Sequence, residues 1–417
     1  MNLPADWEVA PLGAAFDVQQ GKALSPEARG GLSPRPFLRT ANVLWGRLDL
    51  RTLDTMDFSA EEAERLALKP ADLLVCEGGE IGRTALWTGK IPGCLYQNHV
   101  HRLRARRTDI DPLFVMYWMQ AAFLHLRLYG GVGNRTTIPN LSAARLKQLP
   151  LALPSTAEQK AIAAALAQIQ AGVDTQHRLV ERLKELKAAT MTKLFREGLH
   201  GKGLKQTDIG AIPEDWTVVD LGRHCQVRSG GTPSRDIPGY WNGHIPWVKT
   251  GEIDYRPIRH TGEHITQAGL EDSSAKLFPK GTLLLAMYGQ GITRGKVAFL
   301  ETEAATNQAT AALFPDERLD AGFLYAYCCF AYESIRNLAH GANQKNLSID
   351  LIRRIRVPLP PELEEQRSIY SVVSALDARC HAAERQALFY RHLFTSMLHL
   401  LMSGQLRLMQ FETRSAS

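Results

Sequence analysis

The sequence predicts an α+β protein in which two similar mixed α/β domains are separated by two long helices, which form an antiparallel coiled coil with a pseudo-two-fold internal repeat. Three observations predict this architecture. An opening segment, LPADWEVAPLG at residues 3–13, returns as IPEDWTVVDLG at residues 212–222. Later blocks recur in the same order, and each copy ends in a long segment with the apolar spacing of a coiled coil.

The repeated opening is too similar to arise by chance. Background composition would give roughly one identity over eleven positions. A chain of 417 residues also exceeds the length over which one hydrophobic core keeps growing, so two or three domains are expected. The identical pairs are Pro4/Pro213, Asp6/Asp215, Trp7/Trp216, Val9/Val218, Leu12/Leu221 and Gly13/Gly222.

The middle of each copy predicts strands and a buried helix. Residues 69–87 and 279–300 both contain an apolar run, a glycine-containing turn with a basic residue and a second apolar stretch, which is typical of strand, loop and strand. Side-chain amides then recur in YQNHV at 96–100 and TNQAT at 306–310. Farther along, 28 residues from Asp111 align with those from Asp320, and the matched pairs are Asp111/Asp320, Phe114/Phe323, Ala122/Ala331, Arg127/Arg336 and Asn134/Asn343.

Each copy ends in a long helix whose start is marked in the sequence. Prolines precede an acid-Gln-base triplet at residues 158–160 and again at 365–367, and Ser155 forms a capping box with the acid three residues later. The two segments run to Gly198 and Gly404. At 1.5 Å per residue, a helix of about 40 residues is roughly 60 Å long.

Apolar residues in both helices recur at alternating steps of four and three, which is the seam of a coiled coil. Gln176, Lys187 and Thr190 fall on the seam of the first helix, so it is less regular than the second. Antiparallel pairing is expected to put the two repeats at opposite ends of the paired helices. The predicted seam residues are Ile162, Leu166, Ile169, Val173, Val180, Leu183 and Leu194 in the first helix, and Ile369, Val373, Leu376, Cys380, Tyr390, Phe394, Met397 and Leu401 in the second.

These elements give the expected domain boundaries. A polar, glycine-rich linker passes the chain from the first helix to the second repeat. The boundaries are 1–154 for the first mixed domain, 155–200 for the first long helix, 201–211 for the linker, 212–360 for the second mixed domain, 361–404 for the second long helix and 405–417 for a C-terminal tail.

Charge and composition narrow the class of protein. The chain has 49 Lys plus Arg against 43 Asp plus Glu, a net charge of +6, which permits nucleic-acid binding without requiring it. The six cysteines show no CxxC spacing, so we expect them to be small buried hydrophobic residues of a protein in a reducing cytoplasm.

The sequence shows no signal for secretion or membrane insertion. The N-terminus carries acids where a signal peptide needs basic residues. The most apolar stretch, from Pro112, is too short to span a bilayer, so a cytoplasmic protein with no membrane partner is expected.

Motifs for catalysis are missing from the sequence. There is no Asn/Asp-Pro-Pro-aromatic motif of an amino-methyltransferase and no GxxxxGK[ST] phosphate loop. The GQGITRGK segment from Gly289 has the wrong spacing and is interpreted as a hairpin turn. His99 and His101 lie two apart with no third ligand nearby, which favours a polar surface over a metal site. We therefore expect no catalytic residue, metal or cofactor in this chain.

The repeated LPxDW…LG opening, the GxxN loop followed by PLxLP…EQ, and the long helix after each resemble the specificity subunit of type I restriction-modification systems over essentially the whole chain. The resemblance implies a non-catalytic reader with two target recognition domains, each binding one half of a bipartite, asymmetric DNA sequence. It implies that the helices set the spacer and dock two methylation subunits, and that two restriction subunits join the complex. S-adenosylmethionine and ATP with Mg²⁺ are then expected on the partner subunits.

Candidate DNA contacts are the Arg, Lys, Asn, Gln, His and Thr residues of the expected loops, because these side chains bond purine edges or neutralise phosphates. The amides of the paired positions Asn98/Gln308 and Asn134/Asn343 could equally stabilise their own loops. The candidates are Arg39, Thr40, Arg83, Asn98, His99, Arg102, Arg104, Asn134 and Arg135 in the first domain, and Lys249, Thr250, Arg294, Lys296, Asn307, Gln308, Asn343, Gln344 and Lys345 in the second.

Two other functions stay open from the sequence. The chain could be a two-headed scaffold that binds proteins instead of DNA, in which case its affinity for duplex would be weak and only slightly dependent on salt. It could also be the target-reading part of another DNA methyltransferase system.

Overall fold

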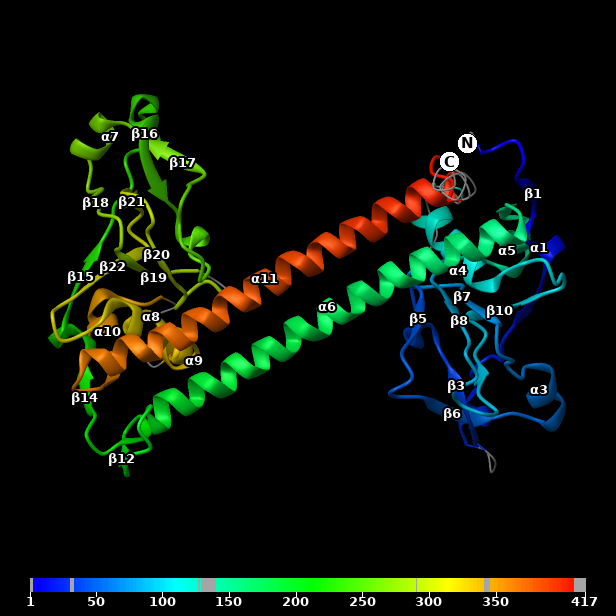
Figure 1. The fold of residues 1–417 in the computed structure, drawn as a ribbon, viewed down its shortest axis with the longest axis horizontal. Helices are drawn as coiled ribbons and strands as arrows, with labels where there is room; N and C mark the ends of the chain where they lie inside the picture. The colour runs from blue at the N-terminus through cyan, green and yellow to red at the C-terminus, as the bar shows by residue number, and fades with distance from the viewer. Residues whose placement is uncertain are drawn as a thin grey trace, which may run out of the picture. The chain divides into compact units, whose positions relative to one another are not determined.

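The computed structural model describes residues 3–30, 34–126, 128, 140–289, 291–340 and 346–408. The chain divides into two compact units (Figure 1). Unit 1 contains Met1–His177 and Arg385–Ser417, and unit 2 contains Arg178–Glu384. Both boundaries fall inside the long helices α6 (Thr156–Glu197) and α11 (Leu363–Met402), so each unit includes part of each helix.

Unit 1 combines small sheets with short helices. One sheet has the strand order β2-β10-β7-β8, a second has β6-β3-β9, and β1 pairs antiparallel with β11. The bounds are β1 Glu8–Pro11, α1 Leu12–Ala15, β2 Phe16–Gln20, α2 Pro26–Arg29, β3 Pro34–Leu38, η1 Thr40–Asn42, β4 Val43–Leu44, β5 Arg47–Leu48, β6 Asp54–Asp57, α3 Ala60–Arg65, β7 Leu73–Cys76, β8 Thr84–Leu86, β9 Leu95–Tyr96, β10 Val100–Ala105, α4 Pro112–Leu124, α5 Ala143–Gln148 and β11 Pro150–Leu153.

Unit 2 has the strand orders β15-β22-β19-β20 and β17-β16-β21-β18, and β14 pairs antiparallel with β23. The bounds are β12 Leu204–Thr207, β13 Gly210–Pro213, β14 Thr217–Asp220, η2 Leu221–Arg223, β15 Cys225–Ser229, η3 Pro238–Tyr240, β16 Trp241–Val248, η4 Thr250–Glu252, β17 Glu263–Ile265, α7 Gln267–Glu271, β18 Leu277–Phe278, β19 Leu283–Ala286, β20 Val297–Phe299, β21 Ala304–Thr306, β22 Thr310–Pro315, α8 Ala321–Phe330, α9 Tyr332–Asn337, η5 Leu338–His340, α10 Ile349–Arg353 and β23 Arg356–Leu359.

The two units repeat one topology, which confirms the internal duplication predicted from sequence. The order β2-β10-β7-β8 of unit 1 corresponds to β15-β22-β19-β20 of unit 2, and β1-β11 corresponds to β14-β23. A parallel contact also recurs, between β3 and β9 in unit 1 and between β16 and β21 in unit 2. In each unit the repeated opening therefore leads into a strand that pairs with the strand just before the long helix.

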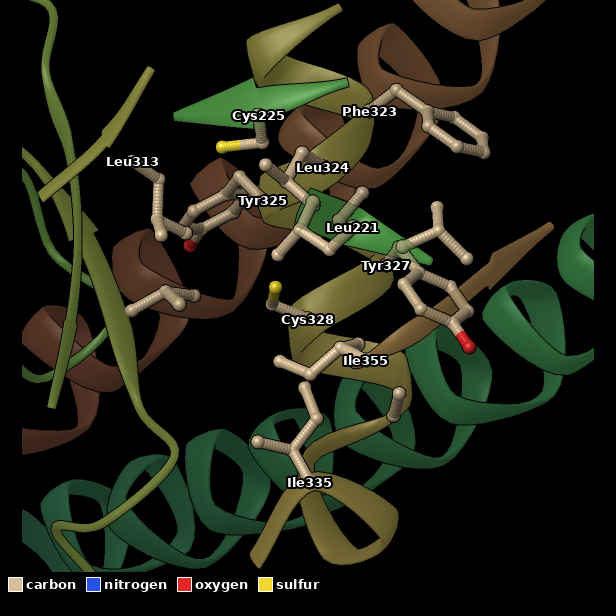
Figure 2. Close-up of a cluster of buried hydrophobic side chains, with 14 of the residues drawn as sticks. Leu221, Cys225, Leu313, Phe323, Leu324, Tyr325, Tyr327, Cys328, Ile335 and Ile355 are labelled. Atoms are coloured by element: carbon tan, nitrogen blue, oxygen red, sulfur yellow. The ribbon is translucent and has the colours of Figure 1, made fainter. Parts of the chain in front are cut away.

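A buried helix forms the centre of the core in each unit. In unit 2, α8 packs Phe323, Leu324, Tyr327 and Cys328 among strands and helices (Figure 2). The corresponding helix α4 of unit 1 buries its residues on most of its faces. Five of the six cysteines are buried and one is partly exposed. Burial raises the pKa of the Cys225 thiol to about 12, as expected for a cysteine that serves as a small hydrophobe.

The glutamine of each acid-Gln-base triplet joins its long helix to the core of its own unit. In unit 1, the Gln159 Oε1 accepts a hydrogen bond from the backbone N–H of Asp111 (2.9 Å), the residue that caps α4. In unit 2, the Gln366 Oε1 accepts from the backbone N–H of Asp320 (2.8 Å), which caps α8. Both glutamines are buried, so these repeated bonds fix where each long helix begins.

The long helices pack antiparallel in each unit, as predicted. In unit 1, the first part of α6 contributes Ile162 and Leu166 to a cluster with Leu398 and Leu401 near the end of α11. In unit 2, the end of α6 and the start of α11 share one cluster that includes Leu194 and Ile369. The other predicted seam residues are also buried or partly buried: Ile169, Val173, Val180, Leu183, Val373, Leu376, Cys380, Tyr390, Phe394 and Met397.

Polar residues on the first seam have different environments. Lys187 forms an ion pair with Asp377 of α11 inside unit 2. In unit 1, the Gln176 Oε1 is buried and forms no hydrogen bond with the described part of the chain. At Gly172 the two long helices of unit 1 pack closely, because an added Cβ would lie only 2.7 Å from the Tyr390 ring.

An ion pair follows the end of each long helix. Arg407, just after α11, bonds Glu158 (Nε to Oε1, 2.5 Å) and Asp6 (Nη2 to Oδ2, 2.8 Å) in unit 1. Lys202, just after α6, bonds Asp215 (2.6 Å) in unit 2. The aspartate of each repeated opening is therefore held by a cation that follows a long helix.

The segment predicted as a linker contains regular structure. Residues 204–213 form the antiparallel hairpin of β12 and β13, and β13 begins directly after the turn with Gly210 at a φ of +105°. A glycine tolerates this backbone conformation far better than other residues do. Among the described helices, none combines the length and apolar character needed to cross a membrane.

Candidate nucleic-acid interface

Loops of unit 2 bring several predicted DNA contacts together. Lys249 and Thr250 follow β16, while Asn307 and Gln308 follow its parallel neighbour β21. The Thr250 hydroxyl donates to the Asn307 Oδ1 (2.8 Å), and both residues are largely shielded. Lys249 and Gln308 are exposed at the surface. In this pair of loops, Thr250 and Asn307 therefore act as braces and Lys249 and Gln308 are accessible to a ligand.

A third loop, after β15, contacts the same surface. The Thr232 hydroxyl of this loop donates a hydrogen bond to the Gln308 side chain. Its Arg235 forms an ion pair with Glu263 (2.6 Å), and Glu263 also accepts from Lys249 (2.9 Å). These five residues, Thr232, Arg235, Glu263, Lys249 and Gln308, are called the reading cluster below. Hydrogen bonding to Glu263 raises the pKa of Lys249, so this side chain stays cationic at neutral pH.

Arg235 and Glu263 are not among the contacts predicted from the sequence. The available signal was the segment GGTPSR followed by Trp241 and Trp247. Two tryptophans six residues apart on one strand predict an aromatic face, because residues an even number apart point to the same side. Without the fold, nothing in the sequence indicates that a loop arginine lies on that face.

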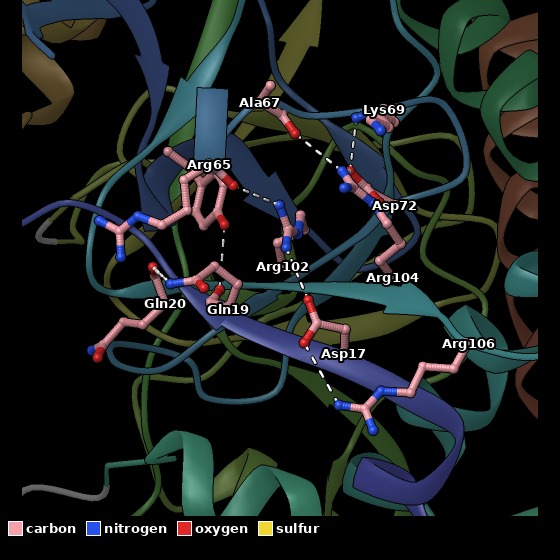
Figure 3. Close-up of polar contacts among 11 residues, drawn as sticks. Asp17, Gln19, Gln20, Arg65, Ala67, Lys69, Asp72, Arg102, Arg104 and Arg106 are labelled. Carbon is pink, nitrogen blue, oxygen red and sulfur yellow. Dashed lines mark hydrogen bonds and ion pairs between the residues drawn. The ribbon is translucent and has the colours of Figure 1, made fainter. Parts of the chain in front are cut away.

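Arg102 and Arg104 of unit 1, both predicted DNA contacts, lie in structural ion pairs (Figure 3). Arg102 is buried and donates to the Asp17 Oδ2 (3.0 Å) and to a backbone carbonyl. Arg104 donates through Nε and Nη2 to both oxygens of the buried Asp72 (2.7 and 2.6 Å). Because Arg102 is buried and Arg104 is held by Asp72, we leave both residues out of the proposed DNA interface.

Other candidates in unit 1 differ in accessibility. Arg39 is exposed and pairs with Asp54 (2.9 Å), while Thr40 is half-buried and its carbonyl accepts from Arg83 (2.9 Å). Arg83 therefore braces the loop that carries Arg39. Asn98 is half-buried and its neighbour His99 is exposed. Of these residues, Arg39, Asn98 and His99 have side chains that a ligand can reach.

The remaining described candidates, Arg294 and Lys296, are buried or paired, and so is His101, which is considered with His99 only as a metal ligand. His101 is buried, with its Nε2 2.9 Å from the carbonyl of Leu141. In unit 2, Arg294 is buried, and Lys296 pairs with Asp254 (2.5 Å). Across the described residues, no group of three His, Cys, Asp or Glu side chains is arranged to hold a metal ion. The predicted contacts outside the described residues are Asn134, Arg135, Asn343, Gln344 and Lys345.

Comparison with known sequences gives one consistent family. The profile of the type I restriction modification DNA specificity domain matches residues 4–185 and again 213–388. The type I restriction enzyme MjaVIII specificity subunit of Methanocaldococcus jannaschii is 24% identical over 422 residues, covering 98% of this chain and 94% of its own. The EcoBI specificity subunit of Escherichia coli is 22% identical over 414 residues, covering 93% and 82%.

A solved structure has the same fold. The type I restriction-modification system S subunit from M. genitalium superposes with a TM-score of 0.63 at 17% sequence identity, covering 96% of this chain and 98% of its own. The two profile matches together cover most of both units, and each match contains one copy of the repeated topology.

Proposed function

The chain belongs to the family of type I restriction-modification DNA specificity subunits, which are non-catalytic, and from this premise we propose that its two units each bind one half of an asymmetric DNA target. The observation that supports this is a repeated topology with different surface chemistry. Unit 2 offers the reading cluster, whereas the accessible candidates among the described residues of unit 1 are Arg39, Asn98 and His99. Two units of the same topology that present different hydrogen-bond donors and acceptors suit two half-sites of different sequence.

We further propose that α6 and α11 set the separation of the half-sites and bind the methylation subunits. Helices of 42 and 40 residues are each about 60 Å long at 1.5 Å per residue. Large apolar residues are exposed on the later part of each: Leu179 and Leu186 of α6 in unit 2, and Leu388 and Phe389 of α11 in unit 1. These side chains occupy different positions of the two helices, and exposed apolar side chains of this kind suit the docking of one partner subunit on each unit.

The catalytic steps are assigned to the partner subunits and not to this chain. We propose that two methylation subunits supply S-adenosylmethionine and methyl transfer to adenine N6, that two restriction subunits supply ATP with Mg²⁺ and cleavage, and that the complex acts in the cytoplasm. In this scheme the present chain binds and positions duplex DNA. Its own exposed side chains provide hydrogen bonds and charge, and no step of bond cleavage is assigned to them.

The test combines purified chain, DNA and a labelled methyl donor. The chain alone is expected to transfer no methyl group, and addition of its methylation subunit is expected to start transfer. Sequencing N6-methyladenine in DNA from cells with the complete system should then return two unlike half-sites with a fixed separation. Methylation at a single contiguous site would contradict one half-site per unit. Weak duplex binding with little dependence on salt would favour a protein scaffold instead.

Replacing Leu186 by aspartate is expected to weaken binding of the methylation subunit by about tenfold or more, because burial of a leucine is worth roughly 1.5–3 kcal/mol. The change introduces a charge at an exposed position of α6 and removes no core contact. Ala188→Asp is the matched control, since Ala188 is exposed nine residues from Leu179 and so faces another side of the helix. Equal loss with both variants would contradict a docking role for the Leu179 and Leu186 face.

A further inference from the structure

Arg235 of unit 2 is held on an aromatic platform. Its guanidinium carbon lies 3.6 Å from the ring centroid of Trp241 and 5.2 Å from that of Trp247. The two indoles meet edge to face with centroids 5.1 Å apart. A planar guanidinium gains both cation–π and stacking energy on such a surface. Even so, 54% of the side-chain surface of Arg235 remains exposed.

The same tryptophans also fix the backbone of the arginine loop. The Trp241 Nε1 donates to the carbonyl of Ser234 and the Trp247 Nε1 to the carbonyl of Gly231, each at 3.0 Å. Glu263 then binds the Arg235 Nη2 at 2.6 Å. The loop backbone and the Arg235 guanidinium are therefore both held in place before any ligand binds. Little side-chain entropy remains to be lost on binding, which is how preorganisation raises affinity.

We propose that Arg235 reads a guanine in the major groove of the half-site that unit 2 binds. This inference rests on the proposed function and names one base contact within it. An arginine held in one orientation can donate two parallel hydrogen bonds, one to the O6 and one to the N7 of guanine. This two-bond contact is the commonest specific contact between a protein and a base. Glu263 occupies part of one edge of the fork, and the guanidinium keeps further N–H donors for a ligand.

The neighbours of Arg235 favour a base over a phosphate. The Glu263 carboxylate lies within hydrogen-bond distance of both Arg235 and Lys249, so a phosphate approaching either cation also meets a negative charge. A base edge carries no net charge and avoids this repulsion. Thr232 and Gln308 lie in the same cluster, and their side chains suit hydrogen bonding to bases.

Among the described side chains that follow the corresponding glycine of unit 1, no arginine takes the place of Arg235. After the corresponding glycine, Gly21, the chain continues with Lys22, whose ammonium lies 5.3 Å from the ring centroid of Phe58 and 2.6 Å from Glu62. An ammonium is a point charge and cannot make the planar two-bond contact of a guanidinium. The proposed guanine contact therefore concerns the half-site that unit 2 binds.

The first experiment selects bound sequences from a random duplex pool with the full-length chain. The natural chain is expected to enrich one invariant G·C pair in one half-site that Arg235→Ala no longer enriches. Arg235→Lys keeps the charge and should also lose this preference, whereas a phosphate contact would survive it. Arg259→Ala is the matched control, because Arg259 is another exposed arginine paired with a glutamate, Glu301, and no aromatic contact is seen for it in the described chain.

The second experiment replaces that guanine by 7-deazaguanine, which lacks the N7 acceptor. The natural chain should bind the altered duplex about 10- to 100-fold more weakly, and Arg235→Ala should bind the two duplexes equally. Uniform weakening of all sequences by Arg235→Ala, or an unchanged selected sequence, would overturn the guanine contact while leaving DNA reading by unit 2 intact. A natural chain that selects no sequence at all would overturn the proposed function and this contact with it.

Discussion

Gly230→Ala is expected to lower the free energy of unfolding of unit 2 by roughly 3 kcal/mol, at the upper end of the usual cost of overpacking. A Cβ at this position would lie 2.1 Å from the carbonyl oxygen of Thr306 and 2.7 Å from its carbonyl carbon. These are main-chain atoms of β21, so relief requires movement of the strand or of the loop that follows β15. That loop carries Thr232 and Arg235, so DNA binding should also weaken.

The measurement is urea denaturation of the full chain, with hydrogen exchange to locate the loss in unit 2. Gly251→Ala is the control, because an added Cβ there meets no atom within 4 Å. We expect this control to unfold at nearly the natural urea concentration. Similar loss of stability in the two variants would show that the close approach of Gly230 to Thr306 is not the cause.

Asp72→Ala is expected to destabilise unit 1 by about 2–3 kcal/mol, because it leaves a partly buried guanidinium without its counter-charge. Asp72 is buried and accepts two hydrogen bonds from Arg104 and one from the backbone N–H of Lys69 (2.7 Å). Because 31% of the Arg104 side chain is exposed, water compensates part of the loss. The expected cost is therefore below that of a fully buried pair.

Thermal and urea unfolding of Asp72→Ala should be compared with those of Asp49→Ala. Asp49 also binds an arginine, Arg51, and hydrogen bonds from it lower the pKa of Asp49 to about 2, but the pair is at the surface. Surface ion pairs contribute little to stability, so removal of Asp49 should leave the unfolding midpoint nearly unchanged. If both variants unfold alike, the Arg104 pair has no special structural role.

The parts of the fold that depend on spacing could be predicted from sequence. The internal repeat, the long helices and their seams follow from residue identities at fixed separations, and the structure confirms antiparallel packing in each unit. The cap predicted at Ser155 follows the same logic, because a cap acts within three residues, and its hydroxyl accepts from the backbone N–H of Glu158 (3.3 Å). Local rules of this kind need no knowledge of the tertiary fold.

The environment of individual charges could not be predicted in this way. Arg102 is paired with Asp17, 85 residues earlier in the chain, and no local pattern identifies that partner. Arg235 depends on Trp241 and Glu263, which come from two strands of one sheet. An arginine in a sequence can form either a buried structural ion pair or an accessible contact to a ligand, and only the tertiary fold distinguishes the two.

The ion pairs of Arg407 affect how the protein can be handled. Through this guanidinium, the segment that follows α11 is bonded to Asp6, five residues from the first methionine. Labels attached beside Asp6 or beside Arg407 would therefore act on the same corner of unit 1. A label on an exposed loop of unit 2, far from both ends in the sequence, would leave that corner undisturbed during purification and immobilisation.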